Sequence, residues 1–323
     1  MHSLTRRALA ALALAGCTAA FAQGNVGTPL RITSVFPTGS GPDVVARIVA
    51  EKLQARSNRP VVVDAKPGGA GMVAINGIKN AGGAGNDLVL LDVGNVSINP
   101  LIFKNLSYDP DKDLVPVAVL YKTAFFVVVS ADSPHKTLQD LVKAAGDKQK
   151  KLTFGSNAVG GPIHLHSERL AHAIGAEMVH VPFKEISALY TAVATREVDW
   201  AFGSIGSAGP LLRAGKLRFL AVADQARSPV LPAVPTLQEA GGPADLHATS
   251  WVALMAPRGT SPALAAEVNR AVNEALAQAD VKEKFGTFGF VPAPGPVQQV
   301  TDLMLADRSR YAEVVKRVKV SID

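Results

Sequence analysis

The sequence predicts an α/β protein built from two domains. Ten short segments are apolar almost throughout, which is typical of strands buried on both faces, as in parallel sheets. Helical patterns separate these segments, and the alternation of strand and helix favours an α/β fold. The chain has 323 residues, 48% of them hydrophobic, which is enough for two cores of ordinary size.

The expected elements follow one another along the whole chain after its first 29 residues. Strands are expected at residues 30–36, 60–64, 88–93, 115–120, 125–130, 151–156, 177–183, 198–203, 217–223 and 250–257. Helices are expected at residues 43–56, 72–80, 137–145, 163–174, 186–195, 206–214, 262–278 and 297–318. No tandem repeat is present.

The first 22 residues have the features of a secretory signal peptide. Two arginines precede an apolar run at residues 8–15, which is too short to span a membrane. Two processing sites compete, because cleavage after Ala22 would release a soluble protein, whereas "LAGC" resembles a lipobox and would leave Cys17 lipidated. We favour cleavage after Ala22, which removes the only cysteine and excludes disulfides, thiol catalysis and zinc–thiolate sites.

The charge pattern argues against a nucleic-acid partner. The formal net charge is +6, but the basic residues are scattered and form no run of five. Aromatic residues are few and do not alternate with the basic ones. A solvated surface explains this pattern better than a nucleic-acid-binding patch.

Two stretches share the same order of features: a strand, a Gly/Ser loop, a Gly-Pro pair and an amphipathic helix. They are "ITSVFPTGSGPDVVARIVAEKL" and "KLTFGSNAVGGPIHLHSERLAHAI". Pro42 and Pro162 suit the first position of a helix, where a missing N–H costs little. If the two helix starts face each other across a cleft, both dipoles and both sets of free N–H groups point at one anion.

The loop at residues 39–41 fits neither nucleotide motif. Val44 stands where a Rossmann fingerprint needs its third glycine, and no Gly-Lys-Ser/Thr follows. The functional interpretation is a small-anion site, with hydroxyls from Thr38 and Ser40 and no lysine to balance a polyphosphate; the alternative is a tight turn without a ligand. Asp43, in the first helical turn, is expected to shape the loop.

A second glycine turn, "KPGGAGMVA" at residues 66–74, precedes the next helix. The structural interpretation is a turn that reverses the chain. The functional interpretation is a turn whose backbone, free of side chains, comes close to a ligand.

Three side chains, His164, Glu168 and His172, share one face of the helix at 163–174. Because H-E-x-x-H is absent, capping or polar packing is favoured over a metal site, and no metal is expected. His164 lies in the first turn and could reach a ligand held there, whereas His180 is expected to be a strand residue.

No catalytic motif is present, and we expect a protein that is not an enzyme. G-x-S-x-G does not occur, and neither does a paired-carboxylate motif. The alternative is a secreted hydrolase with Ser204 or Ser156 as nucleophile, for which His164 is the only candidate base near Ser156.

Nine segments together resemble the Bug-type periplasmic solute receptors, the binding proteins of tripartite tricarboxylate transporters. They occur in the family's order and cover nearly all of the mature chain. They are "VFPTGSGPDVVAR", "KPGGAGMV", "NPLIFKNLSYDPDKDLVPV", "FGSNAVGGPIHL", "HVPFK", "VDWAF", "GKLRFLAVA", "RSPVLPAVPTLQEAG" and "WVALMAPRGTSP".

The resemblance implies a type II periplasmic-binding-protein fold, in which two α/β domains joined by two crossing strands close on a ligand. Domain 1 would comprise residues 23–118 and 254–323, and domain 2 residues 119–253. The implied ligand is a small carboxylate and no cofactor is implied. The partners would be inner-membrane transporter subunits or, alternatively, a sensor-kinase ectodomain. The protein itself would be a periplasmic receptor that works as a monomer.

The resemblance also implies a binding site, position by position. Its first wall would comprise Phe36, Thr38, Gly39, Ser40 and Asp43, with Gly69, Ala70 and Gly71 behind them and Asn95 and Ser97 as polar contacts. Its second wall would comprise Ser156, Asn157, Ala158, Gly160, Gly161 and His164, with Lys184, Gly203 and Ser204. Gly203 stands where the family commonly has an aspartate suited to an ammonium group, so a plain carboxylate is expected.

Overall fold

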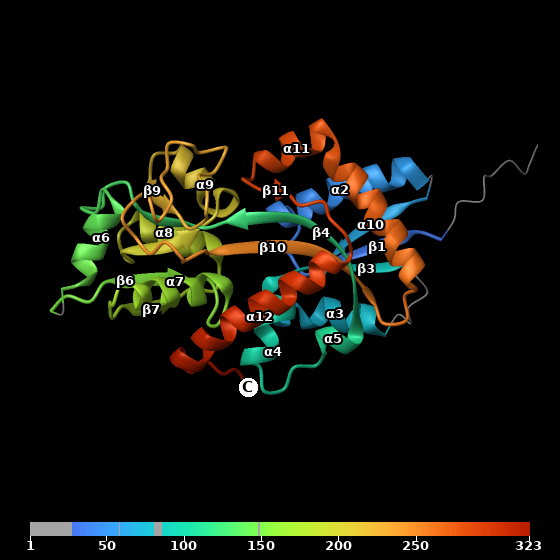
Figure 1. The fold of residues 1–323 in the computed structure, drawn as a ribbon, viewed down its shortest axis with the longest axis horizontal. Helices are drawn as coiled ribbons and strands as arrows, with labels where there is room; N and C mark the ends of the chain where they lie inside the picture. Colours follow the sequence, from blue (N-terminus) through green and yellow to red (C-terminus); the bar gives the residue numbers. More distant parts are fainter. Residues whose placement is uncertain (1–27, 58, 81–85, 148) are drawn as a thin grey trace, which may run out of the picture.

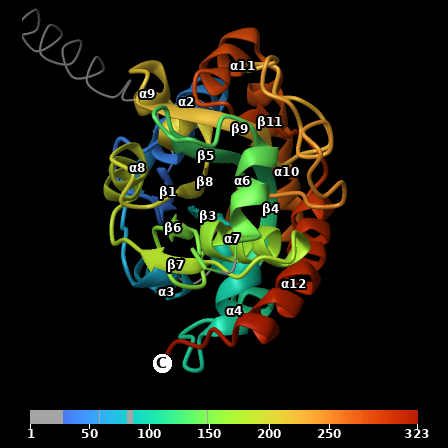
Figure 2. The same ribbon diagram turned by 90° about the vertical axis from the view of Figure 1, so that its left-hand side faces the viewer.

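The computed structural model describes residues 28–57, 59–80, 86–147 and 149–323. The expected signal peptide, with both of its processing sites, lies outside this part of the chain. Figure 1 shows two lobes, each a β-sheet with its helices, lying side by side and joined by two long strands, and Figure 2 shows the molecule from the end of the second lobe. This is the two-domain α/β architecture that the sequence predicts.

The first sheet has six strands in the spatial order β11-β4-β10-β3-β1-β2. β1 is parallel to β2 and β3, whereas β10 is antiparallel to β3 and β4. The strands are β1 (Leu30–Ser34), β2 (Val61–Ala65), β3 (Asp87–Asp92), β4 (Leu114–Ala124), β10 (Thr249–Pro257) and β11 (Val291–Pro292). The helices are α2 (Gly41–Ser57), η1 (Gly69–Gly71), α3 (Met72–Lys79), η2 (Gly94–Ile98), α4 (Asn99–Ile102), α5 (Pro110–Asp113), α10 (Pro262–Ala277), α11 (Ala279–Gly286) and α12 (Gln298–Val318).

The second sheet has five strands in the order β7-β6-β8-β5-β9. β6 is parallel to β7 and β8, and β5 is antiparallel to β8 and β9. The strands are β5 (Phe126–Ser130), β6 (Thr153–Ser156), β7 (Val179–Pro182), β8 (Trp200–Gly203) and β9 (Leu217–Val222). The helices are α6 (Leu138–Ala145), α7 (Pro162–Ala173), α8 (Ile186–Ala194) and α9 (Ile205–Arg213).

All ten expected strands are present, but both sheets are mixed rather than parallel. β5 is buried along its whole length although both of its neighbours are antiparallel to it. Its apolar sequence therefore reflects burial on both faces and not strand direction. The structure adds β11, η1, η2, α4, α5 and α11, which are short or adjoin an expected helix.

Each lobe has its own core. In the first lobe, α2, α10 and α11 cover one face of the sheet, and α3 and α12 cover the other. In the second lobe, the large buried side chains include Phe126, Phe154 and Trp200.

The chain passes between the lobes at two adjacent points. The Phe125 N–H donates to the Ala248 carbonyl (2.8 Å), and the Ala248 N–H donates to the Ala223 carbonyl (2.8 Å). Close by, the buried His166 ring of α7 lies 2.9 Å from the Tyr311 hydroxyl of α12. The first two hydrogen bonds hold the crossing segments together, and the His166–Tyr311 contact connects the second lobe to the C-terminal helix of the first.

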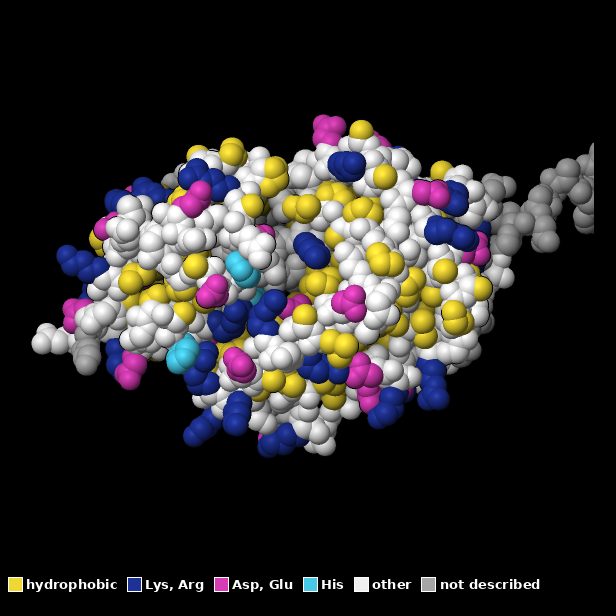
Figure 3. Space-filling view, in the orientation of Figure 1, with side chains coloured by type: hydrophobic (Ala, Val, Ile, Leu, Met, Phe, Trp, Pro, Cys, Tyr) yellow, Lys and Arg dark blue, Asp and Glu magenta, His cyan; other side chains and the backbone are white. Residues whose placement is uncertain are grey.

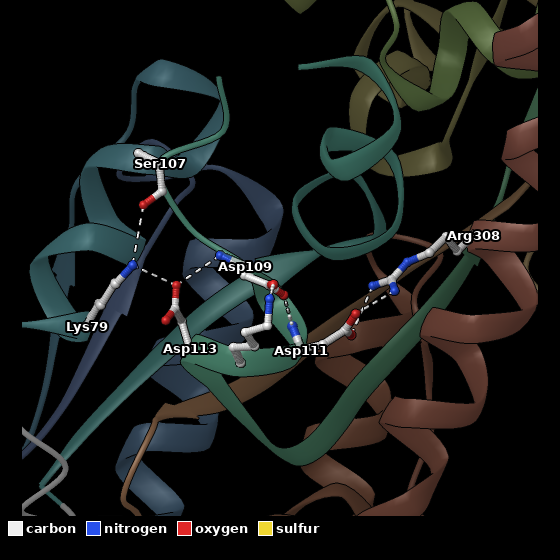
Figure 4. A network of polar contacts seen from close by, with 7 residues as sticks. Lys79, Ser107, Asp109, Asp111, Asp113 and Arg308 are labelled. Atoms are coloured by element: carbon white, nitrogen blue, oxygen red, sulfur yellow. Dashed lines mark hydrogen bonds and ion pairs between the residues drawn. The ribbon is translucent and has the colours of Figure 1, made fainter. Parts of the chain in front are cut away.

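The segment "SYDPDKD" holds the start of β4 in place through ion pairs (Figure 4). Lys79 of α3 pairs with Asp113 at 2.7 Å, and Arg308 of α12 pairs with Asp111 at 2.6 Å. Asp109 accepts the Asp111 N–H and so caps α5. The segment therefore ties α3 and α12, two helices on the same face of the sheet, to the start of one crossing strand.

The α12 face of the molecule is hollowed where the two lobes meet, and charged side chains gather there (Figure 3). A cavity of about 530 Å³ lies beside the crossing strands, lined by residues that include Lys122, Trp251, Asp307 and Arg310. None of the predicted site residues lines this cavity.

Candidate functional site

Each sheet has one place where the chain order reverses across a pair of parallel strands. In the first sheet β1 lies between β2 and β3, and in the second sheet β6 lies between β7 and β8. Ligands of open α/β sheets bind beyond the carboxyl ends of the strands at such switch points. The predicted site residues follow β1, β3, β6 and β8, or the neighbouring strands β2 and β7, so the fold places them at these two points.

The first loop, after β1, is shaped by Asp43. Its carboxylate is buried and accepts the Gly39 N–H at 2.9 Å. Arg47, one turn later on α2, donates to both carboxylate oxygens at 3.0 and 3.1 Å. Gly39 has a φ of 79°, which glycine adopts without strain. Asp43 thus acts on the loop and not on solvent, as the sequence indicates.

The other residues of this loop present mainly backbone to the surroundings. Thr38 and Gly39 are exposed, and Phe36 is half-buried against the first-lobe core. The Ser40 hydroxyl donates to the Pro37 carbonyl at 2.7 Å. A hydroxyl has a single proton, so in this arrangement Ser40 can only accept a hydrogen bond from a ligand.

The turn after β2 is a run of four residues in the left-handed region. Gly68, Gly69, Ala70 and Gly71 have φ values of 123°, 53°, 52° and 90°. For Ala70 this conformation costs about 1–3 kcal/mol. A Cβ at Gly71 would come within 2.3 Å of the Asn95 amide nitrogen, so this approach requires glycine.

Two asparagines hold this turn through the Ala70 carbonyl. Asn95 donates to it at 2.8 Å and Asn99 at 2.9 Å. Asn99 also donates to the Tyr108 hydroxyl, which donates to the Asn95 carbonyl at 2.6 Å. Asn95 therefore positions the turn, a role that the sequence did not reveal, and its contact with a ligand stays a prediction.

Ser97 is fully buried, and its hydroxyl donates to the Met304 carbonyl of α12 at 3.1 Å. In this structure it links η2 to α12, and its contact with a ligand stays a prediction.

The second loop, after β6, repeats the design of the first with a different side chain. Gly160 has a φ of 76°, and its N–H donates to Nδ1 of His164 at 3.0 Å. Pro162 is the first residue of α7 and Gly161 is its cap. Asn157 and Gly161 are half-buried, and Ala158 is exposed. His164 caps the loop, which is the interpretation favoured over a metal ligand.

A stack of rings supports this loop from below. The His164 and His180 rings lie 3.9 Å apart, and Phe154 stacks on His180 at 5.1 Å. Burial and the neighbouring His164 lower the pKa of His180 to about 4. Within the described residues, no group of three or more His, Cys, Asp or Glu side chains is placed to hold a metal ion.

The base nearest to Ser156 is His180, and the expectation that His164 fills this place is wrong. The Ser156 hydroxyl lies 2.7 Å from Nε2 of His180 and 3.0 Å from the Ala158 carbonyl. Ser156 is completely buried, so a substrate cannot reach its oxygen in this structure. Ser204 pairs with Ser207 in a capping box, and no base is among its partners in the described chain.

Gly203 and Lys184 complete the predicted set. A Cβ at Gly203 would lie 2.8 Å from Val128 and 3.1 Å from Tyr190, so a longer side chain has no room there. Lys184 is exposed in the loop after β7.

The segment Phe288–Phe290 brings the two lobes together and was missed at the sequence level. The Phe290 ring would contact a Cβ at Gly41 of α2 (3.0 Å) and one at Gly206 of α9 (3.5 Å). One ring therefore lies between the first turns of helices from different lobes. A Cβ at Gly160 would likewise meet Ile102 of α4 at 2.7 Å. The loops at the two switch points thus border the same interface.

No helix in the described residues combines the length and apolar character needed to cross a membrane.

Two curated proteins are similar to this chain in sequence along most of their length. The UPF0065 protein in the tcbD-tcbE intergenic region of Pseudomonas sp. (strain P51) is 31% identical over 320 residues, covering 98% of this chain and 95% of that protein. BugT of Bordetella pertussis is 28% identical, covering 89% of this chain and 88% of BugT.

Two solved structures hold a bound acid. Rpa4515 of R. palustris with adipate is 27% identical with a TM-score of 0.82, covering 91% of this chain and 98% of that one. MatC from Rhodopseudomonas palustris with bound malate is 28% identical with a TM-score of 0.76, covering 89% and 99%.

The model of the tripartite tricarboxylate transporter receptor family, TctC, matches residues 45–320. Members of this family are periplasmic solute receptors. The chain belongs to the TctC family of tripartite tricarboxylate transporter receptors.

Proposed function

We propose that the protein captures a small carboxylate between the loops at its two switch points. The observation that carries this proposal is the pairing of two alike loops, each ending in a helix N-terminus, at one interface between the lobes. Helix N-termini bind anions because their N–H groups are free and their dipole is positive. The acids bound by two related proteins support the same ligand class.

The ligand would be held chiefly by backbone N–H groups of both loops. We propose that the two walls of the ligand site comprise the residues expected from the sequence, and that Asn95 lies behind the first wall as a positioning residue. The proposed domains are residues 23–118 with 254–323, and 119–253; both boundaries fall inside the crossing strands β4 and β10. Closure would bend these strands and bring the two walls together.

We further propose export to the periplasm, cleavage after Ala22, and delivery of the ligand to the membrane subunits of a tripartite tricarboxylate transporter. A pull-down with these subunits and with a sensor-kinase ectodomain, each with and without ligand, separates transport from signalling.

The binding proposal is tested by thermal shift and calorimetry with C4 to C6 carboxylic acids, including malate and adipate. A ligand at 100 times its Kd adds about 2.7 kcal/mol to the stability of the folded state. Ala158→Trp puts a large side chain on an exposed position of the second loop, and we expect at least tenfold weaker binding.

The matched control is Leu305→Trp on α12, an exposed position outside both loops, which should bind as the unsubstituted protein does. Equal affinity in both variants would place the ligand elsewhere.

A further inference from the structure

Asp92 is a carboxylate at the first switch point that the proposed site does not yet use. It is the last residue of β3, and in the sheet it lies opposite Val252, which in turn lies opposite Tyr121. Residues paired in this way point to the same face of a sheet. Asp92 therefore shares a face with Tyr121, whose ring stacks on Phe290 at 4.0 Å. Phe290 is the ring that lies between the α2 and α9 N-termini.

Only part of this carboxylate is engaged within the described residues. Oδ1 accepts the N–H groups of Gly94 (2.8 Å) and Asn95 (3.3 Å). Oδ2 has no hydrogen bond or ion pair among the described residues, and the side chain is half-buried, so solvent reaches it. Asp43, the other carboxylate at this switch point, is completely occupied by Gly39 and Arg47.

Among the described residues, Asp92 has no ion pair and no hydrogen bond with a cationic side chain. Burial raises its pKa to about 6 although two N–H groups stabilise the charged form. The charge of Asp92 helps to raise the pKa of Tyr108, Tyr121 and Tyr311, which is raised mainly by the burial of each hydroxyl. A half-buried carboxylate that has no cationic partner readily accepts a hydrogen bond from a donor and repels a second carboxylate.

We propose that Asp92 is a specificity-determining residue that accepts a hydrogen bond from a donor group on the carbon chain of the captured acid. The preferred ligands are then hydroxy- or amino-carboxylates, with the ligand carboxylate on the helix N-termini and its donor on Oδ2. Gly203 has no room for a side chain, whereas Asp92 on the first lobe offers an oxygen, Oδ2, that has no hydrogen-bond partner among the described residues. This inference rests on the proposed carboxylate site and replaces the expectation of a plain carboxylate.

The test uses acids that differ in one group only. Calorimetry compares succinate, malate and aspartate, and the matching C5 and C6 sets, on the unsubstituted protein and on Asp92→Asn and Asp92→Ser. Asparagine keeps an acceptor for the Gly94 and Asn95 N–H groups, so the variant should fold, which its melting temperature checks.

We expect the unsubstituted protein to bind a donor-bearing acid at least tenfold more tightly than the plain acid of the same length. Tight binding of aspartate or glutamate would identify an ammonium group as the donor. Tight binding of malate or 2-hydroxyglutarate would identify a hydroxyl group as the donor. Asp92→Asn should weaken an ammonium ligand about tenfold or more, and Asp92→Ser should remove the preference for either donor.

Equal affinity for plain and donor-bearing acids, or a preference that survives both substitutions, would overturn the role of Asp92 and leave the carboxylate receptor intact. Failure of every acid to bind would instead overturn the proposed function, and this inference with it.

Discussion

The loops at the two switch points have the same backbone plan but different chemistry. In each, a glycine with φ near 80° donates its N–H to the side chain four residues later, which lies in the first turn of a helix. The acceptor is the Asp43 carboxylate, paired with Arg47, in the first lobe and the His164 imidazole, stacked on His180, in the second. The shared plan fixes the helix start, and the different acceptors make the loops respond differently to strain, charge and acid.

The sharpest way to separate the loops is the same substitution at both glycines. A Cβ at Gly39 meets nothing within 4 Å, whereas a Cβ at Gly160 would lie 2.7 Å from Ile102 and 3.1 Å from Val320. Gly39→Ala should cost about 1–2 kcal/mol from backbone strain alone. Gly160→Ala should cost about 2–3 kcal/mol, because overpacking adds to the same strain. Urea unfolding measures the loss of unfolding free energy in both variants. Equal losses would mean that the lobes move apart at Gly160 and relieve the contact with Ile102 and Val320.

Removing the charge partner should affect only the first loop. Arg47→Ala leaves the buried Asp43 carboxylate without its cation, and we expect a loss of about 1–2 kcal/mol, because Arg47 is itself 44% exposed. In an Asp43→Asn background the same Arg47→Ala change should cost less than about 0.5 kcal/mol, since no charge remains to be balanced. A double-mutant cycle by denaturant unfolding gives the coupling; additive costs would show that the pair does not support the loop.

Acid should weaken the second loop. The pKa of His180 is lowered to about 4, from an ordinary value near 6.5, so folding disfavours its proton. Its contribution to stability is fully present above pH 6.5 and is lost as the pH falls towards 4. Because the ring is only half-buried, we expect less than about 1 kcal/mol per pH unit.

The control for this acid effect is His180→Gln. Unfolding free energies between pH 7 and 4 should fall less steeply in His180→Gln than in the unsubstituted protein. Parallel curves of unfolding free energy against pH would mean that protonation of His180 does not destabilise the folded protein and that the ring stack does not respond to acid.

The sequence predicted the loops better than the contacts inside them. Glycine, proline and apolar runs are local signals, so all ten strands could be located from them and the two helix starts, observed at 41 and 162, could be placed within two residues. Asn95 and His180 act through residues distant in the sequence, the Ala70 carbonyl and the Ser156 hydroxyl, and no spacing rule reveals such contacts. Phe290 was missed for the same reason, because it joins Gly41 and Gly206 across the lobe interface.

Ser40 gives the smallest expected effect and bears directly on how the first loop holds a carboxylate. Its proton is donated to the Pro37 carbonyl at 2.7 Å, so it is not free for a ligand carboxylate. Ser40→Ala should therefore cost about 0.5–1 kcal/mol of stability, the worth of one partly exposed hydrogen bond. Affinity for the best acid should change less than threefold. A loss of fivefold or more, with stability unchanged, would show that the hydroxyl turns from Pro37 to the ligand on binding. The first loop would then recognise the acid with a side chain and not with backbone alone.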